Sequence, residues 1–572
     1  MRSEDYSTRT GAQLLVDILC IQGVDTIFCV PGESYLAMLD ALRDTQDKIK
    51  LIVCRHEGAA ANMADAYGKL TGTPGICIVT RGPGAAHASI GVHTAKQDST
   101  PMILLIGQIE REFVGREAFQ EIDYRFMFAP LTKWVAEIDR ASRVPELVSR
   151  AFQTAVSGRP GPVALALPED MLTETATVAD VRRYKVVRAH PGPTDLINLH
   201  AMLARAQRPL LLLGGGGWDQ SACADIAAFA EANRLPTAVA FRFQDLFDNR
   251  NELYIGDVGL GINPRLALCV RDADLLLVVG PRLSEATTGG YELLKPPRLE
   301  RAQQLVHVHA DPEELSRVYQ ADLPINAGMS AFAAAARQLD PVESTHWQSW
   351  LTSARQSYLQ HIAVPDIGLC HSERFVDMSQ VVKYLRERLP ADAIIVNGAG
   401  NYTTWIHRFY QYRTFRTQLA PTSGAMGYGL PAAIAAKLQY PERVVVAFAG
   451  DGCFLMYGQE LATAMQYKLN IVILVVNNFM YGTIRMHQER KYPGRVYGTE
   501  LLNPDFAAFA RAFGAQGKIV DRTEDFPPAF EEALTAETPW LLELRVDPDV
   551  ITPYARLSEI RIEGMAHQEQ KG

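Results

Sequence analysis

The segments VVVAFAGDG, residues 444–452, and IVILVVNN, residues 471–478, decide how this chain folds. Each begins as a continuous apolar run of the kind that forms a buried parallel strand. The helix-like stretch MYGQELATAMQYKL, residues 456–469, lies between them. We therefore expect a strand–helix–strand unit in which Asp451 and Asn478 follow neighbouring parallel strands. That edge of an open α/β sheet is where ligands bind.

The side chains at this edge favour a metal–phosphate site. The carboxylate of Asp451 and the amide oxygen of Asn478 form a partial set of hard ligands, which Mg²⁺ completes with a carbonyl, water and phosphate oxygens. Gly452 and the residues after it open a helix, whose N-terminal amides favour an anion. Taken separately, Gly450-Asp451-Gly452 could form a simple turn, and Asn477-Asn478 could mark a β-hairpin. Their combination around one helix predicts an Mg²⁺–diphosphate anchor.

The same alternation of apolar runs and amphipathic stretches extends along the whole chain. The runs fall into three groups, separated by stretches at 173–193 and 341–372: first 26–30, 51–54, 75–80, 102–107 and 163–167; then 210–213, 275–279 and 305–308; then 394–396, 444–449, 471–476 and 540–546. We predict an α/β fold with three doubly wound parallel-sheet domains. Their expected bounds are 1–180, 190–345 and 365–550, followed by a C-terminal tail at 551–572.

Composition narrows the function classes. The chain has 572 residues and a formal net charge of −9, without a basic stripe, which argues against nucleic-acid binding and against binding to anionic membranes. It contains no uninterrupted stretch of ~18 apolar residues, so we expect no transmembrane helix. The eight cysteines are scattered without a CxxC pair, which favours reduced thiols in a cytoplasmic protein.

The Gly-Asp-Gly and Asn-Asn motifs resemble the thiamine diphosphate-binding motif. The order of segments over nearly the whole chain is similar to the acetolactate synthase-like (pyruvate oxidase-type) branch of the thiamine diphosphate-dependent enzymes. This resemblance implies an N-terminal pyrimidine-binding domain, a central Rossmann-like domain and a C-terminal diphosphate-binding domain. It also implies a homodimer or homotetramer with each active site between two subunits.

The resemblance assigns cofactor and metal contacts residue by residue. Asp451 and Asn478 would ligate Mg²⁺ by their side chains, and Met480 by its backbone carbonyl. The Gly424 carbonyl would accept a hydrogen bond from the cofactor's 4′-amino group, and Met426 would be the apolar wedge that bends the cofactor. Gly400, Asn401 and Tyr402 match the family's Gly-Gln-His only in part. The other implied cofactor contacts are Pro31, Gly32, Pro83, Gly450, Gly452, Cys453, Tyr481 and Gly482.

The segment Arg55-His56-Glu57 follows the strand-like run LIVC. The resemblance makes Glu57 the catalytic glutamate, whose carboxyl group meets pyrimidine N1′ and promotes the tautomer that removes the C2 proton. A glutamate favoured by a helix dipole is the alternative. Gly82-Pro83-Gly84 resembles a loop near the pyrimidine, with His87 in place of the usual asparagine. Gln120, with Phe119, would line the pocket opposite the thiazolium.

Three departures from the family pattern concern the substrate and a second cofactor. Glu33 stands where acetolactate synthases have bare backbone. It is either a substrate-side acid/base or a solvated residue at a helix start. His487 stands where those enzymes carry a tryptophan. It is either a substrate ligand or a surface histidine. The central domain keeps only part of the FAD-binding pattern, at Arg282 and at 287–289. FAD, an ADP-like group and an empty site all stay open, and we favour FAD.

These patterns predict an enzyme that depends on thiamine diphosphate and Mg²⁺ and that forms or cleaves a C–C bond beside a carbonyl of a small 2-keto acid. Carboligation is the first hypothesis. A decarboxylase or a C–C lyase or hydrolase of the same family is the alternative. A nicotinamide oxidoreductase would need a dinucleotide fingerprint after a strand, and the Gly-rich segment 424–429 follows QLAPTS instead. A catalytically silent thiamine-binding homologue is the remaining class, and Glu57 argues against it.

Overall fold

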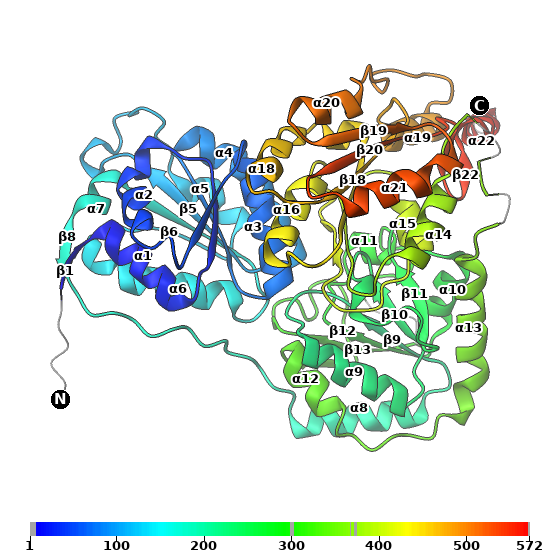
Figure 1. Ribbon diagram of the computed structural model, residues 1–572. Coiled ribbons are helices and arrows are strands. Elements are labelled where there is room, and N and C mark those ends of the chain that lie inside the picture. Colours follow the sequence, from blue (N-terminus) through cyan, green and yellow to red (C-terminus); the bar gives the residue numbers. More distant parts are fainter. Residues whose placement is uncertain (1–6, 298–302, 366–367, 371–373, 570–572) are drawn as a thin grey trace. The chain divides into compact units, whose positions relative to one another are not determined.

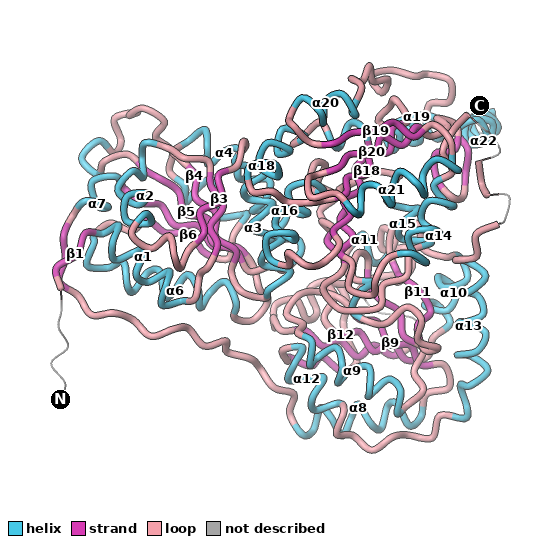
Figure 2. The backbone as a smooth tube through the Cα atoms, viewed as in Figure 1, coloured by secondary structure: helices cyan, strands magenta, loops and turns pink. Residues whose placement is uncertain are grey.

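The computed structural model describes residues 7–297, 303–365, 368–370 and 374–569. Parts of the predicted domains, of the second linker and of the tail lie outside the described residues. These parts are 1–6, 298–302, 366–367, 371–373 and 570–572. The chain forms two compact units, Met1–Arg188 and Ala189–Gly572. Three six-stranded sheets, one in the first unit and two in the second, confirm the α/β class and the three parallel-sheet domains (Figures 1 and 2).

The sheet of the first unit has the strand order β3-β2-β4-β5-β7-β6, and all of its pairs are parallel. Its strands are β2 (Thr26–Cys29), β3 (Lys50–Val53), β4 (Gly75–Val79), β5 (Met102–Gln108), β6 (Trp134–Glu137) and β7 (Pro162–Pro168). The helices are α1 (Gly11–Gln22), α2 (Leu36–Arg43), α3 (Glu57–Thr71), α4 (Gly82–Asp98), α5 (Tyr124–Phe128), α6 (Val144–Val156) and α7 (Glu169–Thr173).

Alternate strand residues sort these helices onto two faces. Ile27, Ile76 and Ile103 share one buried cluster with side chains of α1, α2 and α6. α3 and α4 pack against each other outside that cluster, and α3 contacts β2 and β4. A short antiparallel pair, β1 (Thr8–Thr10) with β8 (Thr175–Thr177), joins the ends of the unit. Because the helices cover the two faces of the sheet, they leave the carboxyl ends of the central strands uncovered. The loops that follow these strands lie there, where ligands bind in such sheets.

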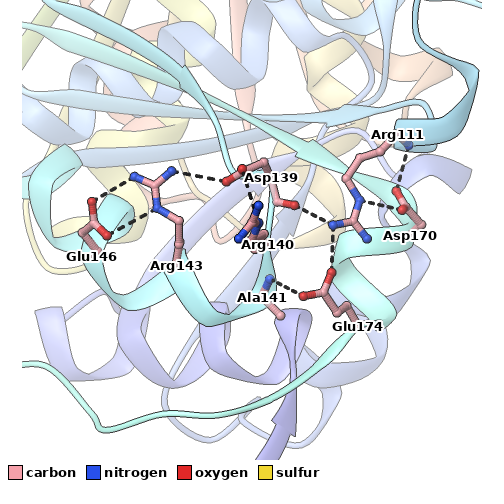
Figure 3. Close-up of polar contacts among 8 residues, drawn as sticks. All are labelled: Arg111, Asp139, Arg140, Ala141, Arg143, Glu146, Asp170 and Glu174. Carbon is pink, nitrogen blue, oxygen red and sulfur yellow. Dashed lines mark hydrogen bonds and ion pairs between the residues drawn. The ribbon is translucent and has the colours of Figure 1, made fainter.

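An ion-pair cluster fixes the loop that follows β5 (Figure 3). The Arg111 Nε lies 2.6 Å from an Asp170 carboxylate oxygen, and its Nη1 lies 2.8 Å from a Glu174 carboxylate oxygen. Asp170 also accepts the Arg111 backbone N–H at 3.0 Å. Farther along the loop, the Glu121 carboxylate accepts the N–H groups of Gly115 and Ala118 at 2.7 and 2.9 Å. The loop that carries Gln120 is thus tied at its start and closed on itself.

The central sheet of the second unit is parallel, with the order β11-β10-β9-β12-β13-β14. Its strands are β9 (Pro209–Leu213), β10 (Thr237–Ala240), β11 (Tyr254–Val258), β12 (Leu275–Val279), β13 (Gln304–His309) and β14 (Leu323–Asn326). The helices are α8 (Pro193–Arg205), α9 (Gln220–Ala232), α10 (Pro264–Asp272), α11 (Glu285–Thr288), α12 (Met329–Ala336) and α13 (Gln348–His361).

The third sheet, also parallel, has the order β16-β15-β17-β18-β20-β19. Its strands are β15 (Ile394–Asn397), β16 (Gln418–Leu419), β17 (Val445–Gly450), β18 (Val472–Asn477), β19 (Gln516–Val520) and β20 (Trp540–Arg545). Its helices include α14 (Met378–Arg388), α15 (Thr403–Phe409), α16 (Gly429–Gln439), α17 (Asp451–Phe454), α18 (Leu461–Gln466), α19 (Gly482–Lys491), α20 (Phe506–Ala512), α21 (Phe526–Thr535) and α22 (Leu557–Glu569). A small ribbon, β21 (Val550–Thr552) with β22 (Ala555–Arg556), precedes α22.

The helix expected over 456–469 is much shorter than predicted. The structure has a 3₁₀ turn at Gly458–Glu460, and only Leu461–Gln466 forms an α-helix, α18. Gly458 lies so close to the Phe454 ring that an added Cβ would be 3.0 Å from a ring carbon. The chain turns at this contact before the helix begins.

Reciprocal hydrogen bonds join the two sheets of the second unit. The Asn249 N–H donates to the Tyr412 carbonyl, and the Tyr412 N–H donates to the Asn249 side-chain oxygen, both at 2.9 Å. The Gln418 amide donates to the Gln244 side-chain oxygen at 3.0 Å and accepts the Gln244 N–H at 2.7 Å. Among the described residues, no helix is both long and apolar enough to cross a lipid bilayer.

Candidate cofactor and active site

The decisive strand–helix–strand unit places Asp451 and Asn478 at one edge of the third sheet. β17 and β18 pair in parallel, with Gly450 opposite Val476. Asp451 is the first residue of α17, directly after β17, and Asn478 directly follows β18. The two residues therefore follow neighbouring parallel strands, as the sequence predicts.

A pocket of about 260 Å³ opens at this edge, entirely within the second unit. Every cofactor or metal position predicted between residues 400 and 482 lines it: Gly400, Asn401, Tyr402, Gly424, Met426, Gly450, Asp451, Gly452, Cys453, Asn478, Met480, Tyr481 and Gly482. These residues come from four separate segments of the chain. The structure thus brings together the motifs that the sequence presented apart.

The Asp451 carboxylate is buried and held by hydrogen bonds. The residue is only 3% exposed, and burial raises the pKa of its carboxyl group. Hydrogen bonds from the Gly452 backbone and from the Asn503 side chain act in the opposite direction on that pKa. A bound cation would also favour the ionised form. The site therefore suits a carboxylate that is paired with a positive charge.

The loop after β18 is shaped by its own asparagines. The Asn478 side-chain oxygen accepts the Met480 N–H at 3.3 Å, and the Asn477 side-chain oxygen accepts the Phe479 N–H at 3.1 Å. Phe479 takes a left-handed conformation with φ of 60°. A neighbouring segment pins this loop, since the Tyr481 N–H donates to the Thr499 carbonyl at 2.9 Å. These bonds fix the backbone at Met480, whose carbonyl is the third predicted ligand.

Side-chain bonds also connect the other walls of the pocket. The Cys453 sulfur accepts the Gly427 N–H at 3.0 Å, which joins α17 to the Gly-rich segment before α16. The Tyr402 hydroxyl accepts the Gly398 N–H at 3.0 Å. The Asn401 side-chain oxygen accepts a hydrogen bond from the Thr483 hydroxyl at 2.9 Å. The Asn401 side chain is therefore engaged with α19, across the pocket from its own turn.

The donor set fits the implied metal and diphosphate. One carboxylate, one amide oxygen and one backbone carbonyl are hard oxygen ligands that leave positions for water and phosphate oxygens. Gly450 faces the Tyr402 ring so closely that an added Cβ would lie 3.0 Å from a ring carbon. Larger residues would crowd the start of α17, so the bare backbone there suits the close approach of a phosphate.

The first unit carries the other predicted site residues, apart from His487, near the carboxyl ends of its own strands. Glu57 is the first residue of α3, and its side chain is 13% exposed. The His56 Nδ1 accepts the Gly58 N–H at 3.0 Å and so caps this helix. His87, on α4, places its Nδ1 2.9 Å from a Glu57 carboxylate oxygen. Glu57 is thus a partly buried carboxylate with a fixed imidazole partner.

Pro31, Gly32, Pro83 and Gln120 border the same strand ends. The Gln120 carbonyl accepts the Gly82 N–H at 3.2 Å, which ties the Gln120 loop to the first turn of α4, where Pro83 lies. Gly32 faces Thr80, and an added Cβ would lie 2.5 Å from the Thr80 Cβ. Gln120 itself has a left-handed φ of 66°. The residues of this unit to which the resemblance assigns cofactor or substrate contacts therefore cluster around the ends of β2 and β4.

Glu33 and His487 occupy exposed positions. Glu33 is exposed and begins a 3₁₀ turn, Glu33–Tyr35, after β2. His487 is exposed on α19. Ile484 of the same helix lines the pocket, but His487, three residues farther along, is not among the described residues that line it. Partial desolvation, with Arg490 and Lys491 nearby, lowers the pKa of His487. Their substrate roles stay predictions.

The sequence reasoning missed one wall of the pocket. This wall is formed by residues before and at the start of α14 and by residues after β20: Cys370, Val376, Met378, Val546, Asp547, Val550 and Ile551. It also missed Asn503, which donates to Asp451 at 2.8 Å. Asn503 lies 25 residues beyond Asn478 in a loop. Only the tertiary fold brings these residues to the motif, and no local spacing signals them.

Comparisons with known proteins give matches along most of the chain. Family models of the thiamine pyrophosphate enzymes match residues 9–127 (N-terminal TPP binding domain), 196–336 (central domain) and 398–544 (C-terminal TPP binding domain). The chain is 31% identical to a probable acetolactate synthase large subunit of Methanocaldococcus jannaschii, over 96% of this chain and 95% of that protein. It is 33% identical to the acetolactate synthase large subunit of Parasynechococcus marenigrum, over 94% and 88%. It is 30% identical to the acetolactate synthase isozyme 2 large subunit of Escherichia coli, over 94% and 95%.

Proposed function

Because this chain belongs to the thiamine pyrophosphate enzyme family and is acetolactate synthase-like over nearly its whole length, we propose that it joins a 2-keto acid donor to a carbonyl acceptor. The observation that carries the proposal is the pocket at the ends of β17 and β18. Asp451, Asn478 and Met480 line it together with the glycines of the diphosphate motif. We assign thiamine diphosphate and Mg²⁺ to this pocket.

The cofactor, when bound, supplies a thiazolium that adds to a carbonyl carbon and accepts the electrons released by decarboxylation. The chain's own residues bind and position it. Asp451, Asn478 and the Met480 carbonyl would hold the cation, beside the diphosphate. The Gly424 carbonyl would accept a hydrogen bond from the 4′-amino group, and Met426 would pack against the cofactor. Glu57 holds and returns a proton at pyrimidine N1′.

The substrate positions are proposed on the first unit and on α19. Gln120, whose carbonyl accepts the Gly82 N–H, is proposed to line the pocket opposite the thiazolium. Glu33 and His487 are proposed to select the substrate, because they replace the residues that the family carries at those positions. Pro31, Gly32 and Pro83 are proposed to contact the pyrimidine. Replacing Glu33 with glycine should shift the preference among 2-keto acids.

We also propose that the active protein is a homodimer or homotetramer. Large apolar side chains of the first unit are exposed: Leu36 is 61%, Phe119 71% and Phe126 85% exposed. Phe119 precedes Gln120 in the same loop, and Phe126 lies in α5, which follows that loop. Exposed aromatic side chains beside a site favour a covering partner surface. Sedimentation or size-exclusion measurements test this part directly. A cytoplasmic location is proposed from the scattered cysteines alone.

Whether the central domain binds FAD or an ADP-like group is a separate question, with its own experiment. The Gly214–Gly217 turn follows β9, which lies between β10 and β12, and ligands bind at such switch points of open sheets. However, the Arg282 Nε lies 3.1 Å from the Glu314 carboxylate, so this ion pair competes with a phosphate for the guanidinium. The visible absorption spectrum of the purified protein decides whether a flavin is bound.

A substrate panel tests the proposed reaction. The purified protein is supplied with thiamine diphosphate and Mg²⁺ and with 2-keto acids, alone and with second keto acids or aldehydes. Products are identified by mass. Carboligation gives a product that contains carbon from both partners. Release of an aldehyde alone indicates the decarboxylase alternative, and no consumption indicates a silent homologue.

The matched control is Glu57→Gln, which keeps the size of the side chain but cannot exchange a proton. It should bind the cofactor like wild type and lose hydrogen–deuterium exchange at C2. Wild-type exchange in Glu57→Gln would show that the role of Glu57 is wrong.

A further inference from the structure

Asn503 connects two strand ends through a single amide group. Its Nδ2 lies 2.8 Å from the Asp451 Oδ2 and 3.0 Å from the Asn477 Oδ1. An amide nitrogen carries two hydrogens, so each of these bonds uses one of them. The nitrogen must face these acceptors, because an ionised carboxylate only accepts. The amide therefore joins the end of β17 to the end of β18.

The far side of this connection is buried and charged. The Asn477 Nδ2 donates to the Glu543 Oε1 at 2.9 Å. Asn477 is 0% and Glu543 1% exposed. The Glu543 Oε1 also lies 3.1 Å from the Arg545 Nε, and its Oε2 accepts the Phe506 N–H at 3.1 Å. A chain of polar contacts thus runs from β20 through β18 to Asp451.

The same network fixes the loop that carries Asn503. Phe506 begins α20, three residues after Asn503, and its N–H is bound to Glu543. On the other side of Asn503, the Leu501 N–H donates to the Phe479 carbonyl at 2.9 Å. The amide is held from both directions along the chain. Its position is therefore set before any ligand arrives.

We propose that Asn503 is a positioning residue for the metal site, which holds the Oδ2 of Asp451 and so orients this carboxylate toward the cation. This inference rests on the proposed assignment of Mg²⁺ to Asp451. Residues that hold a metal ligand in place typically contribute 10–100-fold to metal affinity, roughly the loss that we expect without Asn503.

The test is Mn²⁺ binding in the presence of saturating thiamine diphosphate, read from the electron paramagnetic resonance signal of free Mn²⁺. Asn503→Ala removes both hydrogen bonds, and Asn503→Leu removes them while keeping a side chain branched at Cγ. Asn470→Ala is the matched control, because Asn470 is an exposed asparagine of the same unit whose amide donates to the Ala536 carbonyl at 3.4 Å. The thermal unfolding midpoint without cofactor and metal reports whether each variant folds.

Both Asn503 variants should bind Mn²⁺ about 10–100-fold more weakly than wild type, and Asn470→Ala should match wild type. The metal concentration for half-maximal carboligation should rise by the same factor, while the rate at saturating metal recovers. A folded Asn503 variant with wild-type Mn²⁺ affinity would overturn the inference alone. If the wild-type protein bound no Mn²⁺ with thiamine diphosphate, the proposed metal site itself would be overturned.

Discussion

The Nδ1 of His87 lies 2.9 Å from the Oε2 of Glu57, so an imidazole holds the carboxylate that is proposed to activate the cofactor. The His87 ring also faces the His56 ring, with the ring centroids 4.5 Å apart. His56 in turn is fixed as the cap of α3 by the Gly58 N–H. Glu57 is therefore oriented by a partner on α4 and by its own helix start.

Replacing His87 with alanine should slow C2 hydrogen–deuterium exchange by about 10–100-fold, because a hydrogen bond to a charged group contributes about 1.5–3 kcal/mol and tenfold in rate equals about 1.4 kcal/mol. His87→Asn, which keeps a short donor and is the family's usual residue, should retain most of the exchange rate. The measurement is proton loss from bound thiamine diphosphate, followed by nuclear magnetic resonance after an acid quench. Equal rates in the wild type and His87→Ala would remove His87 from the activation step.

Asp451→Ala should abolish the stabilisation that the cofactor and metal together provide. A ligand that binds only the folded protein raises its stability by about 2.7 kcal/mol at a hundred times its Kd. The wild-type unfolding midpoint should therefore rise when both ligands are added and fall back when a chelator removes the metal. The midpoint of Asp451→Ala should stay constant in all three conditions. A wild-type response in this variant would place the metal elsewhere.

The central strands could be predicted from the sequence, whereas most edge strands could not. All twelve predicted apolar runs overlap strands, because strands buried on both faces read as continuous apolar segments. In the three large sheets, the edge strands β6, β11, β14, β16 and β19 were missed, as was the interior strand β10. β6 is only half-buried along its length and β16 has two residues. Such segments carry too little apolar character to stand out from loops.

The candidate site divides in the same way. Asp451, Asn478 and Glu57 directly follow strands or begin helices, so their positions could be predicted from local sequence. Asn503 and Val550 reach the site from segments far along the chain. Their contacts depend on how α20 and the C-terminal ribbon pack, which no spacing in the sequence reports. The tail predicted at 551–572 illustrates this, since its described part forms α22 and contributes Ile551 to the pocket.

Arg561→Met should loosen α22 from α19. The buried Glu489 carboxylate lies 2.7 Å from the Arg561 Nη2 and 2.8 Å from the Arg485 Nη2, and it accepts the Gly494 N–H at 2.8 Å. Hydrogen bonds to the Glu489 carboxylate lower the pKa of this group to about 2, and the bond from Arg561 has the largest effect. Loss of the Arg561 contact should cost about 1–3 kcal/mol, since Glu489 keeps its other partners.

Hydrogen exchange of the α22 amides measures this effect, and it should accelerate in Arg561→Met. Glu563→Gln, at an exposed position of the same helix, is the control and should exchange like wild type. Because α22 comes within reach of α19 at Gly564, where an added Cβ would lie 2.5 Å from the Glu489 carbonyl oxygen, Gly564→Ala should loosen the helix as well. Unchanged exchange in both Arg561→Met and Gly564→Ala would mean that neither contact holds α22.

Asp245 should make the stability of the second unit depend on pH. The residue is 8% exposed at the junction of the two sheets, where its carboxylate accepts the N–H groups of Thr417 and Gln418 at 3.0 and 3.2 Å. Burial raises the pKa of this carboxyl group to about 6, against about 3.9 in an unfolded chain. Between these values the unfolded chain has released its proton while the folded protein retains it.

The free energy of unfolding should therefore fall as the pH rises from about 4 to about 6, and this contribution should be constant outside that window. Asp245→Asn cannot ionise, so it should lose this part of the pH dependence. Relative to wild type, the variant should gain roughly 3 kcal/mol between pH 4 and pH 7, from two pKa units at about 1.4 kcal/mol each. Urea unfolding across this range measures the difference. Parallel curves for the two proteins would mean that the buried carboxyl group keeps its ordinary pKa, and that the N–H groups of Thr417 and Gln418 compensate fully for its burial.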